Sequence, residues 1–231
     1  MTRNLAITVV LILGAVVSLG IYAYSSSSGT PAPKTPPSAA ASAAPSSPTG
    51  PAPEDLLVRD NSRYLSRADG AEVTVVEFLD FECEACRAQF PVMEKLRAEY
   101  DGRIDFVIRY FPLPGHTNSK TAATAVEAAA QQGALEEMYV KMYETQAEWG
   151  ESKESKAEVF VGFAEELGLD VERFRADMDA PATLERVRAD FADGVQLGIR
   201  GTPTIFVNGR QTQQMPSYEA LSSMIDRELQ G

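Results

Sequence analysis

The chain has 231 residues, 44% of them hydrophobic, and a formal net charge of −12 at pH 7. All of the acidic residues follow residue 53, which argues against nucleic acid and anionic lipid as partners of that part of the chain. Two cysteines and one histidine are too few for an ordinary zinc site, so we expect no metal and no cofactor.

The N-terminus predicts a membrane anchor. Residues 1–4 are short and positive, and residues 5–24 carry no charge over about the length that spans a bilayer. A cleavable signal peptide normally has a shorter apolar core, although Ala23-Tyr24-Ser25 is a weak cleavage site. We therefore predict a transmembrane signal anchor at residues 1–24, single-pass, with Arg3 in the cytoplasm and the rest of the chain exported across the cell membrane.

A low-complexity segment follows at residues 25–53. It consists of Ser, Ala, Pro, Thr and Gly with one lysine, and it has no aromatic residue. Such a segment buries too little apolar surface to fold, so we expect a disordered linker. Residues 54–231 are long enough for one domain with a sizeable core.

Hydrophobic patterns within that domain predict mixed secondary structure. We expect strands at 72–79, 104–111 and 204–207, and a paired segment at 211–213 after the turn signal Asn208-Gly209. We expect helices at 85–100, 119–132, 134–149, 156–167, 171–179 and 183–197, and a last helix that Ser217 caps and that ends at 229. The order of these elements predicts an α/β domain with a helical insertion at about residues 117–199.

The only two cysteines, Cys83 and Cys86, lie where the first predicted strand gives way to a helix. This spacing is typical of thiol–disulfide exchange. The helix N-terminus favours a thiolate at Cys83, which we expect to be exposed, while Cys86 is shielded and can resolve a mixed disulfide. The alternatives are weaker: a structural disulfide gains little by closing so short a loop, and inert thiols are unexpected in an oxidising compartment.

Two motifs together resemble a known family. The predicted strand, the Cys-x-x-Cys pair and a helix containing Pro91 are followed much later by Gly201-Thr202-Pro203-Thr204 before a hairpin. This order resembles the thioredoxin superfamily, and the helical block between its halves resembles the DsbA branch of exported dithiol oxidases. The resemblance covers about residues 70–230. It implies a thioredoxin-like fold, with Cys83 as the nucleophile and Cys86 as the resolving cysteine.

The resemblance also implies the rest of the site. Pro203 matches a proline that follows a cis peptide bond beside the cysteines, so the backbone of Thr202 is expected to dock an extended substrate peptide. Glu77 matches a buried acid that relays protons to the resolving thiol, and burial would raise its pKa. An outward-facing strand residue is the alternative for Glu77. For His116, a general base and a loop residue that caps the following helix or faces solvent both remain open.

The residues around the cysteines differ from those of strong oxidases in the DsbA branch. The dipeptide between the cysteines is Glu-Ala, where strongly oxidising members carry Pro-His. Glu82 and Glu84 both flank Cys83, and their charge disfavours a thiolate. A less stabilised thiolate makes a less oxidising disulfide, which leaves a reductase or isomerase open.

The sequence thus predicts a membrane-tethered, extracytoplasmic thiol:disulfide oxidoreductase that forms disulfides in exported proteins. Its implied partners are exported proteins with cysteines and a membrane quinone-linked reoxidase, either DsbB-like or vitamin K epoxide reductase-like. One alternative is an exported reductase or isomerase. Another is a thioredoxin-fold binding or chaperone module with a non-catalytic disulfide, which a reduction potential below about −300 mV would favour.

Overall fold

The computed structural model describes residues 50–231. The predicted membrane anchor at residues 1–24 and nearly all of the predicted linker lie outside the described residues. Within residues 50–231, no helix combines the length and the apolar character that crossing a membrane requires.

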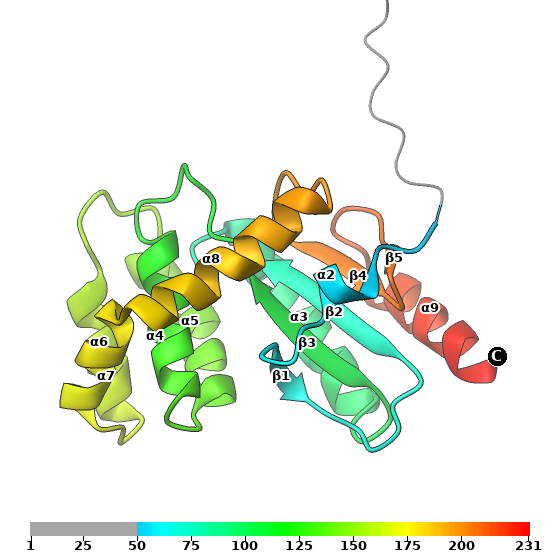
Figure 1. Cartoon of the computed structure of the whole chain (residues 1–231), viewed down its shortest axis with the longest axis horizontal. Coiled ribbons are helices and arrows are strands. Elements are labelled where there is room, and N and C mark those ends of the chain that lie inside the picture. The colour runs from blue at the N-terminus through cyan, green and yellow to red at the C-terminus, as the bar shows by residue number, and fades with distance from the viewer. Residues whose placement is uncertain (1–49) are drawn as a thin grey trace, which may run out of the picture. The chain divides into compact units, whose positions relative to one another are not determined.

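A five-stranded sheet forms the centre of the domain (Figure 1). In sheet order the strands are β1 (Arg63–Ser66), β3 (Asp105–Tyr110), β2 (Thr74–Leu79), β4 (Thr204–Val207) and β5 (Arg210–Gln211). Strands β2 and β3 are parallel, and the other neighbours are antiparallel. A parallel pair needs a crossover connection, and helix α3 (Glu84–Glu99) supplies it, so the start of α3 lies at the end of β2.

The remaining helices divide into an insertion and two flanking elements. They are α2 (Glu54–Leu57), α4 (Ser119–Ala130), α5 (Leu135–Trp149), α6 (Ala157–Glu166), α7 (Val171–Asp179), α8 (Pro181–Gln196) and α9 (Tyr218–Gln230). Helices α4 to α8 follow one another between β3 and β4 and form the insertion. In Figure 1, α4 to α7 gather at one end of the sheet, and α8 runs back across it.

The thioredoxin-like α/β fold with a helical insertion is confirmed. The sequence missed β1 and α2, because each has only four residues and so shows little periodicity. The bounds predicted for the return strand, 211–213, were wrong, because β5 spans Arg210–Gln211. Asn208 and Gly209 both have positive φ, 45° and 78°, and form a two-residue turn, so pairing resumes at Arg210.

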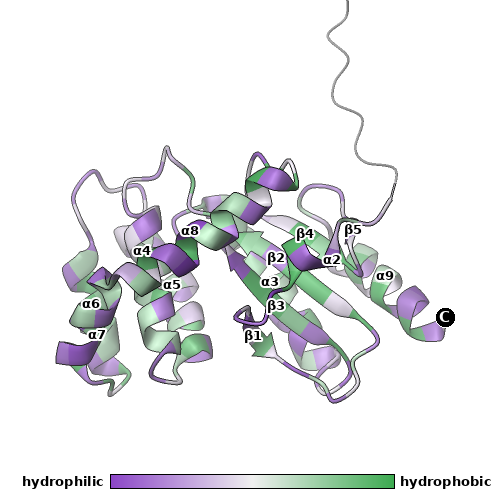
Figure 2. Cartoon of the chain, viewed as in Figure 1, coloured by the Kyte–Doolittle hydropathy of each residue, from purple (hydrophilic) through white to green (hydrophobic). Residues whose placement is uncertain are grey.

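The sheet separates two hydrophobic cores, because alternate residues of a strand face opposite sides. Val75, Leu79 and Ile108 belong to the larger core, which also contains both cysteines and residues of α3, α4, α5 and α9. Val76 and Phe78 belong to a smaller core that α2 and α8 cover. Figure 2 shows hydrophobic and hydrophilic segments alternating along the helices, as expected for elements with one buried face.

A buried ion cluster lies on the side of the smaller core. The Arg109 guanidinium on β3 donates to Asp190 and Asp193 on α8, at 2.5 Å each. It also donates to the carbonyl oxygens of Leu56 and Leu57, at 2.9 and 2.6 Å. Two further arginines pair with the same carboxylates: Arg59 and Arg186. The cluster therefore connects the N-terminal segment, the middle of the sheet and the insertion.

Candidate active site

The two cysteines lie at the beginning of α3. Cys83 is the N-cap residue, Cys86 lies in the first turn, and both are free thiols. Cys83 is 7% exposed and Cys86 is 1% exposed. The predicted order of exposure holds, but the expectation that Cys83 is exposed was wrong. The loop before β4 covers it, since the Cys83 Sγ lies 3.5 Å from the carbonyl oxygen of Thr202.

The surroundings shift the pKa values of the two thiols in opposite directions. The hydrogen bond from Cys86 lowers the pKa of Cys83 to about 6 against the effect of burial, and a polar contact from Thr202 and backbone N–H groups of Cys86 and Ala85 contribute. These amides are unpaired donors of a helix N-terminus. Burial, followed by the interaction with Cys83 and the charge of Glu77, raises the pKa of Cys86 well above its ordinary value. At neutral pH the pair is therefore a thiolate at Cys83 and a thiol at Cys86.

This low pKa runs against the expectation that the flanking glutamates leave the thiolate unfavoured. Glu82 is buried, and its Oε2 accepts a hydrogen bond from the N–H of Asn118 at 2.6 Å. Glu84 is exposed in the first turn of α3, where solvent screens its charge. Neither carboxylate outweighs the Cys86 thiol and the helix N-terminus in setting the pKa of Cys83.

Glu77 lies in the middle of β2, opposite Ile108 on β3 and Ile205 on β4. It is 2% exposed, so the alternative of an outward-facing residue was wrong. Burial, with smaller contributions from Glu94 and Cys83, raises the pKa of Glu77 to about 8. Its Oε2 has no hydrogen-bond partner among the described residues. Glu77 is close enough to influence the pKa of Cys86, and an uncharged carboxyl group there can give a proton to the Cys86 thiolate that forms when a disulfide between the cysteines opens.

The peptide bond between Thr202 and Pro203 is cis, as the resemblance implied. The bond immediately precedes β4, which pairs with β2 directly before the cysteines. The structure therefore brings Cys83, Cys86, Glu77 and the Thr202–Pro203 pair into one site. The backbone of Thr202 borders the Cys83 sulfur, which is where a docked peptide would have to lie.

Residues of the insertion also hold the site, and the sequence gave no sign of them. Gln146 on α5 donates through Nε2 to the carbonyl oxygens of Phe81 and Cys83, at 2.7 and 2.9 Å. The Asn118 side chain donates to the carbonyl oxygens of Ser152 and Glu154, while its N–H binds Glu82. Only a signal for contacts across some 30 to 60 residues of chain, such as covariation between positions, could have found them.

His116 does not simply face solvent from its loop. Its side chain is 21% exposed, and its Nδ1 lies 2.7 Å from an Asp80 carboxylate oxygen. Asp80 directly follows β2 and is buried. The sequence analysis identified His116 but no partner for it. That partner, Asp80, lies three positions before the first cysteine and 36 residues before His116, so no local pattern connects the two residues.

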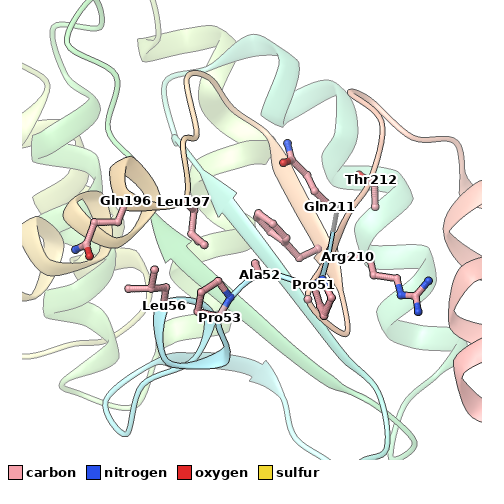
Figure 3. A pocket seen from close by; sticks show the side chains of 12 residues that line it. Pro51, Ala52, Pro53, Leu56, Gln196, Leu197, Arg210, Gln211 and Thr212 are labelled. Atoms are coloured by element: carbon pink, nitrogen blue, oxygen red, sulfur yellow. The ribbon is translucent and has the colours of Figure 1, made fainter. Parts of the chain in front are cut away.

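An open pocket of about 650 Å³ lies apart from the cysteines (Figure 3). It is lined by residues 50–53, the end of α8 and the β4–β5 hairpin, including Leu197 and Phe206 of the smaller core. The N–H of Ala52 donates to Gly209 at 2.8 Å, so packing begins before the predicted domain start at residue 54. Because this pocket lies on the other face of the sheet, it is not part of the cysteine site. Residues 50–231 contain no cluster of metal-binding side chains.

A Cys-x-x-Cys pair at a helix N-terminus, beside a cis-proline loop and above a buried acid, defines a thiol–disulfide exchange site. Comparison with known proteins agrees with this class. The thioredoxin family profile matches residues 68–227. The Na(+)/H(+) antiporter NhaA of Herminiimonas arsenicoxydans is 38% identical over 161 residues, which are 68% of this chain and 24% of that protein. The chain thus spans about a quarter of the length of the curated relatives that it matches.

Solved structures agree in fold. A thioredoxin-like oxidoreductase from Silicibacter pomeroyi DSS-3 superimposes with a TM-score of 0.66 at 29% identity, over 78% of this chain and 99% of that one. The thiol-disulfide exchange protein alpha-DsbA2 from Wolbachia pipientis has a TM-score of 0.64 at 20% identity, over 75% and 90% of the two chains. The chain therefore belongs to the thioredoxin family and has a DsbA-like fold.

Proposed function

We propose that this protein is an extracytoplasmic, membrane-tethered oxidase that forms disulfides in exported proteins. The observation that carries the direction of the reaction is the pKa of Cys83, lowered to about 6. A stabilised thiolate favours the reduced pair over the disulfide, so the disulfide is a stronger oxidant. The nucleophilic cysteine of the reductase thioredoxin has a pKa of about 7 and that of the strong oxidase DsbA about 3.5, so the Cys83 value lies between the two and below that of the reductase.

In the proposed reaction, a substrate thiolate attacks the Sγ of Cys83 in the Cys83–Cys86 disulfide. The bond between the two cysteines breaks, and Cys86 leaves as a thiolate that takes a proton from Glu77. A second substrate thiolate then attacks the substrate sulfur of the mixed disulfide. The substrate disulfide forms, and Cys83 leaves as a thiolate. Two electrons pass from substrate to protein, and the low pKa of Cys83 makes it a good leaving group.

Three roles in this site are part of the proposal. Cys83 is the attacked sulfur, because it is the more exposed of the two. Glu77 is the proton donor to Cys86, since its pKa of about 8 keeps it protonated at neutral pH. Thr202 and Pro203 form the substrate-docking edge, because the Thr202 carbonyl oxygen lies 3.5 Å from the Cys83 sulfur.

The location and the partners rest on the N-terminal sequence and on the relatives. The uncharged run at residues 5–24 supports a membrane anchor, and residues 25–53 support a tether. Matching segments within sodium/proton antiporters support a domain of this kind working at a membrane. The reduced pair must give up its two electrons and the proton of Cys86, for which we propose a membrane quinone-linked reoxidase, DsbB-like or vitamin K epoxide reductase-like.

Two measurements test this function. The first is a redox titration of the purified protein against glutathione. We expect a potential between the roughly −120 mV of DsbA and the roughly −270 mV of thioredoxin, and clearly above the latter. A value near the latter would identify a reductase, and one below about −300 mV a structural disulfide. The second is trapping with Cys86→Ala in the native cell envelope, where captured exported proteins support disulfide exchange with them, whose direction the potential decides, and where an absence of captured proteins contradicts the oxidase. The matched control is Cys83→Ala, which should capture none.

A further inference from the structure

The Asp80 carboxylate gathers three donors around the active-site loop. Its Oδ2 accepts the N–H of Leu113 at 2.9 Å and lies 2.7 Å from Nδ1 of His116. Its Oδ1 accepts the N–H of Glu82 at 2.9 Å. Because a carboxylate only accepts, the His116 Nδ1 carries the proton of this contact. The imidazole is thereby fixed in orientation, and its Nε2 remains for a second proton.

The same residue also touches the nucleophile. The backbone carbonyl oxygen of Asp80 accepts the N–H of Cys83 at 3.1 Å. One amino acid therefore separates the imidazole of His116 from the backbone of Cys83. The titratable groups that face His116 are Asp80, Glu82 and the Cys83 thiol, and the Glu82 carboxylate is bound by the N–H of Asn118. The charge of Cys83 raises the pKa of His116, so the imidazole and the sulfur of Cys83 interact electrostatically.

We propose that His116 is a positioning residue for thiol–disulfide exchange: Asp80 holds its imidazolium beside Cys83, where its charge stabilises the Cys83 thiolate. The proposal rests on the proposed function only in taking Cys83 as the reactive sulfur. If the charge of His116 stabilises the Cys83 thiolate, the thiolate must stabilise the charged form of His116 by the same free energy, because coupling between two sites is reciprocal. Loss of the thiolate, when Cys83 and Cys86 join in a disulfide, must release a proton from His116 more easily.

The electrostatics around His116 agree with this reading. Burial alone would lower the pKa of His116, but the hydrogen bond to Asp80 and the charges of Asp80, Cys83 and Glu82 raise it above its ordinary value. A raised pKa keeps the imidazolium at higher pH, so the stabilisation of the thiolate is present below that pKa. It is lost as the pH rises through that pKa. The oxidising strength of the disulfide should therefore decrease across that range of pH.

The decisive experiment uses the unaltered protein. His116 is the only histidine of the chain, so its imidazole signals in an NMR pH titration need no assignment by mutation. We expect the pKa of His116 to be about half a unit to one unit higher in the dithiol form than in the disulfide form, from one charge at partly screened distance. Cys83→Ser should titrate like the disulfide form. Equal values in the two redox forms overturn the proposal, and leave the oxidase activity to its own test.

A pair of variants tests the same coupling from the side of Cys83. His116→Gln removes the charge and should raise the pKa of Cys83, read from thiolate absorbance, by the same half to one unit, which is about a 3- to 10-fold decrease in its acid dissociation constant. His116→Lys keeps a cation and should restore the low value, without the change near the pKa of histidine. Equal shifts in both variants, or none in His116→Gln, would mean a structural role and overturn the proposal. If either variant fails to fold, the titration of the unaltered protein decides.

Discussion

The two faces of the central sheet treat buried charge in opposite ways. On one face, Arg109 is fully buried, but two carboxylates and two backbone carbonyl oxygens satisfy its guanidinium. On the other face, Glu77 is nearly as buried, and its Oε2 has no partner among the described residues. Their strands are neighbours, and Glu77 pairs in register with Ile108, the residue before Arg109.

The difference separates stability from chemistry. A buried ion whose hydrogen bonds are all made keeps its charge and holds elements together, although removal of one partner is costly. A buried acid without a partner cannot keep its charge, so its pKa moves into the range where it can give and take protons. The first face therefore connects the insertion to the sheet. In the proposed mechanism, Glu77 on the second face provides a proton for Cys86.

The largest effect on stability should come from removing the buried guanidinium of Arg109, whose hydrogen-bond partners are all present. Arg109→Met leaves Asp190 and Asp193 buried with Arg186, Arg59 and the backbone N–H of Tyr110 as their remaining partners. We expect the free energy of unfolding to fall by about 3–5 kcal/mol in urea denaturation. The control Arg210→Met removes an exposed cation 4.0 Å from Glu228 and should change it by less than about 0.5 kcal/mol. Equal losses would mean that the buried cluster is no more important than a surface pair.

On the face that contains Glu77, removal of the buried group should raise the free energy of unfolding instead of lowering it. Burial raises the pKa of Glu77 to about 8, whereas a glutamate in an unfolded chain titrates near about 4.3. Between these values the native state holds a proton that the unfolded state has lost, so stability falls as the pH rises. Glu77→Gln removes this loss. Relative to the parent, the variant should therefore gain about 2–3 kcal/mol between pH 5 and pH 7.

That measurement is best made on the disulfide form, in which neither thiol titrates. The quantity to compare is the difference in the free energy of unfolding between the variant and the parent, measured at each pH. Only its change with pH reports on Glu77, since the amide can also alter stability by a constant amount at every pH. A difference that stays constant from pH 5 to pH 7 would show that Glu77 is ionised or solvated in the native protein. The contrast between the two faces would then disappear.

Within the reactive face, the two thiols should differ in rate. With a pKa of about 6, Cys83 is mostly thiolate at pH 7, whereas an ordinary cysteine is about 3% thiolate. We expect iodoacetamide to modify Cys83 with a half-maximal rate near pH 6, and to leave Cys86 unmodified until far higher pH. Mass spectrometry of the reduced protein after short exposure identifies the modified site. Faster modification of Cys86 would exchange the roles of the two cysteines.

The smallest effect is expected where charge is exposed. Glu84→Gln removes a solvent-screened carboxylate from the first turn of α3, so the pKa of Cys83 should fall by only about 0.1–0.3 unit. Thiolate absorbance against pH measures it. A fall of a full unit would mean that surface charge, rather than the Cys86 thiol and the helix N-terminus, sets the pKa of Cys83.

The parts of the fold that the sequence predicted rest on local patterns. The apolar run of β2 directly before Cys83 identifies a strand that ends at a helix, and Thr202-Pro203 before a short β run identifies the second half. The structure confirms the elements and the cis bond. Each of these signals lies within a few residues of chain, and one sequence can report such signals by itself.

The missed parts depend on contacts between distant segments. Arg109 reads as one polar residue in an apolar strand, and nothing nearby shows that Asp190 and Asp193 lie above it some 80 residues later. Gln146 is one of several polar residues on an amphipathic helix. Periodicity tells which face of an element is buried, but not which donor will meet which carbonyl oxygen. The side chains that hold the active-site loop could therefore not be predicted from one sequence.

The contacts of Arg109 with the backbone of α2 also have a mechanical consequence. A tethered domain is pulled through the point where its folded part begins, and here that point lies next to Leu56 and Leu57. Their carbonyl oxygens are held by a side chain from β3, an interior strand of the sheet. A force entering at the N-terminal end would therefore be divided: the hydrogen bond from Ala52 to Gly209 would load the β4–β5 hairpin at the edge of the sheet, and the Arg109 guanidinium would load its centre.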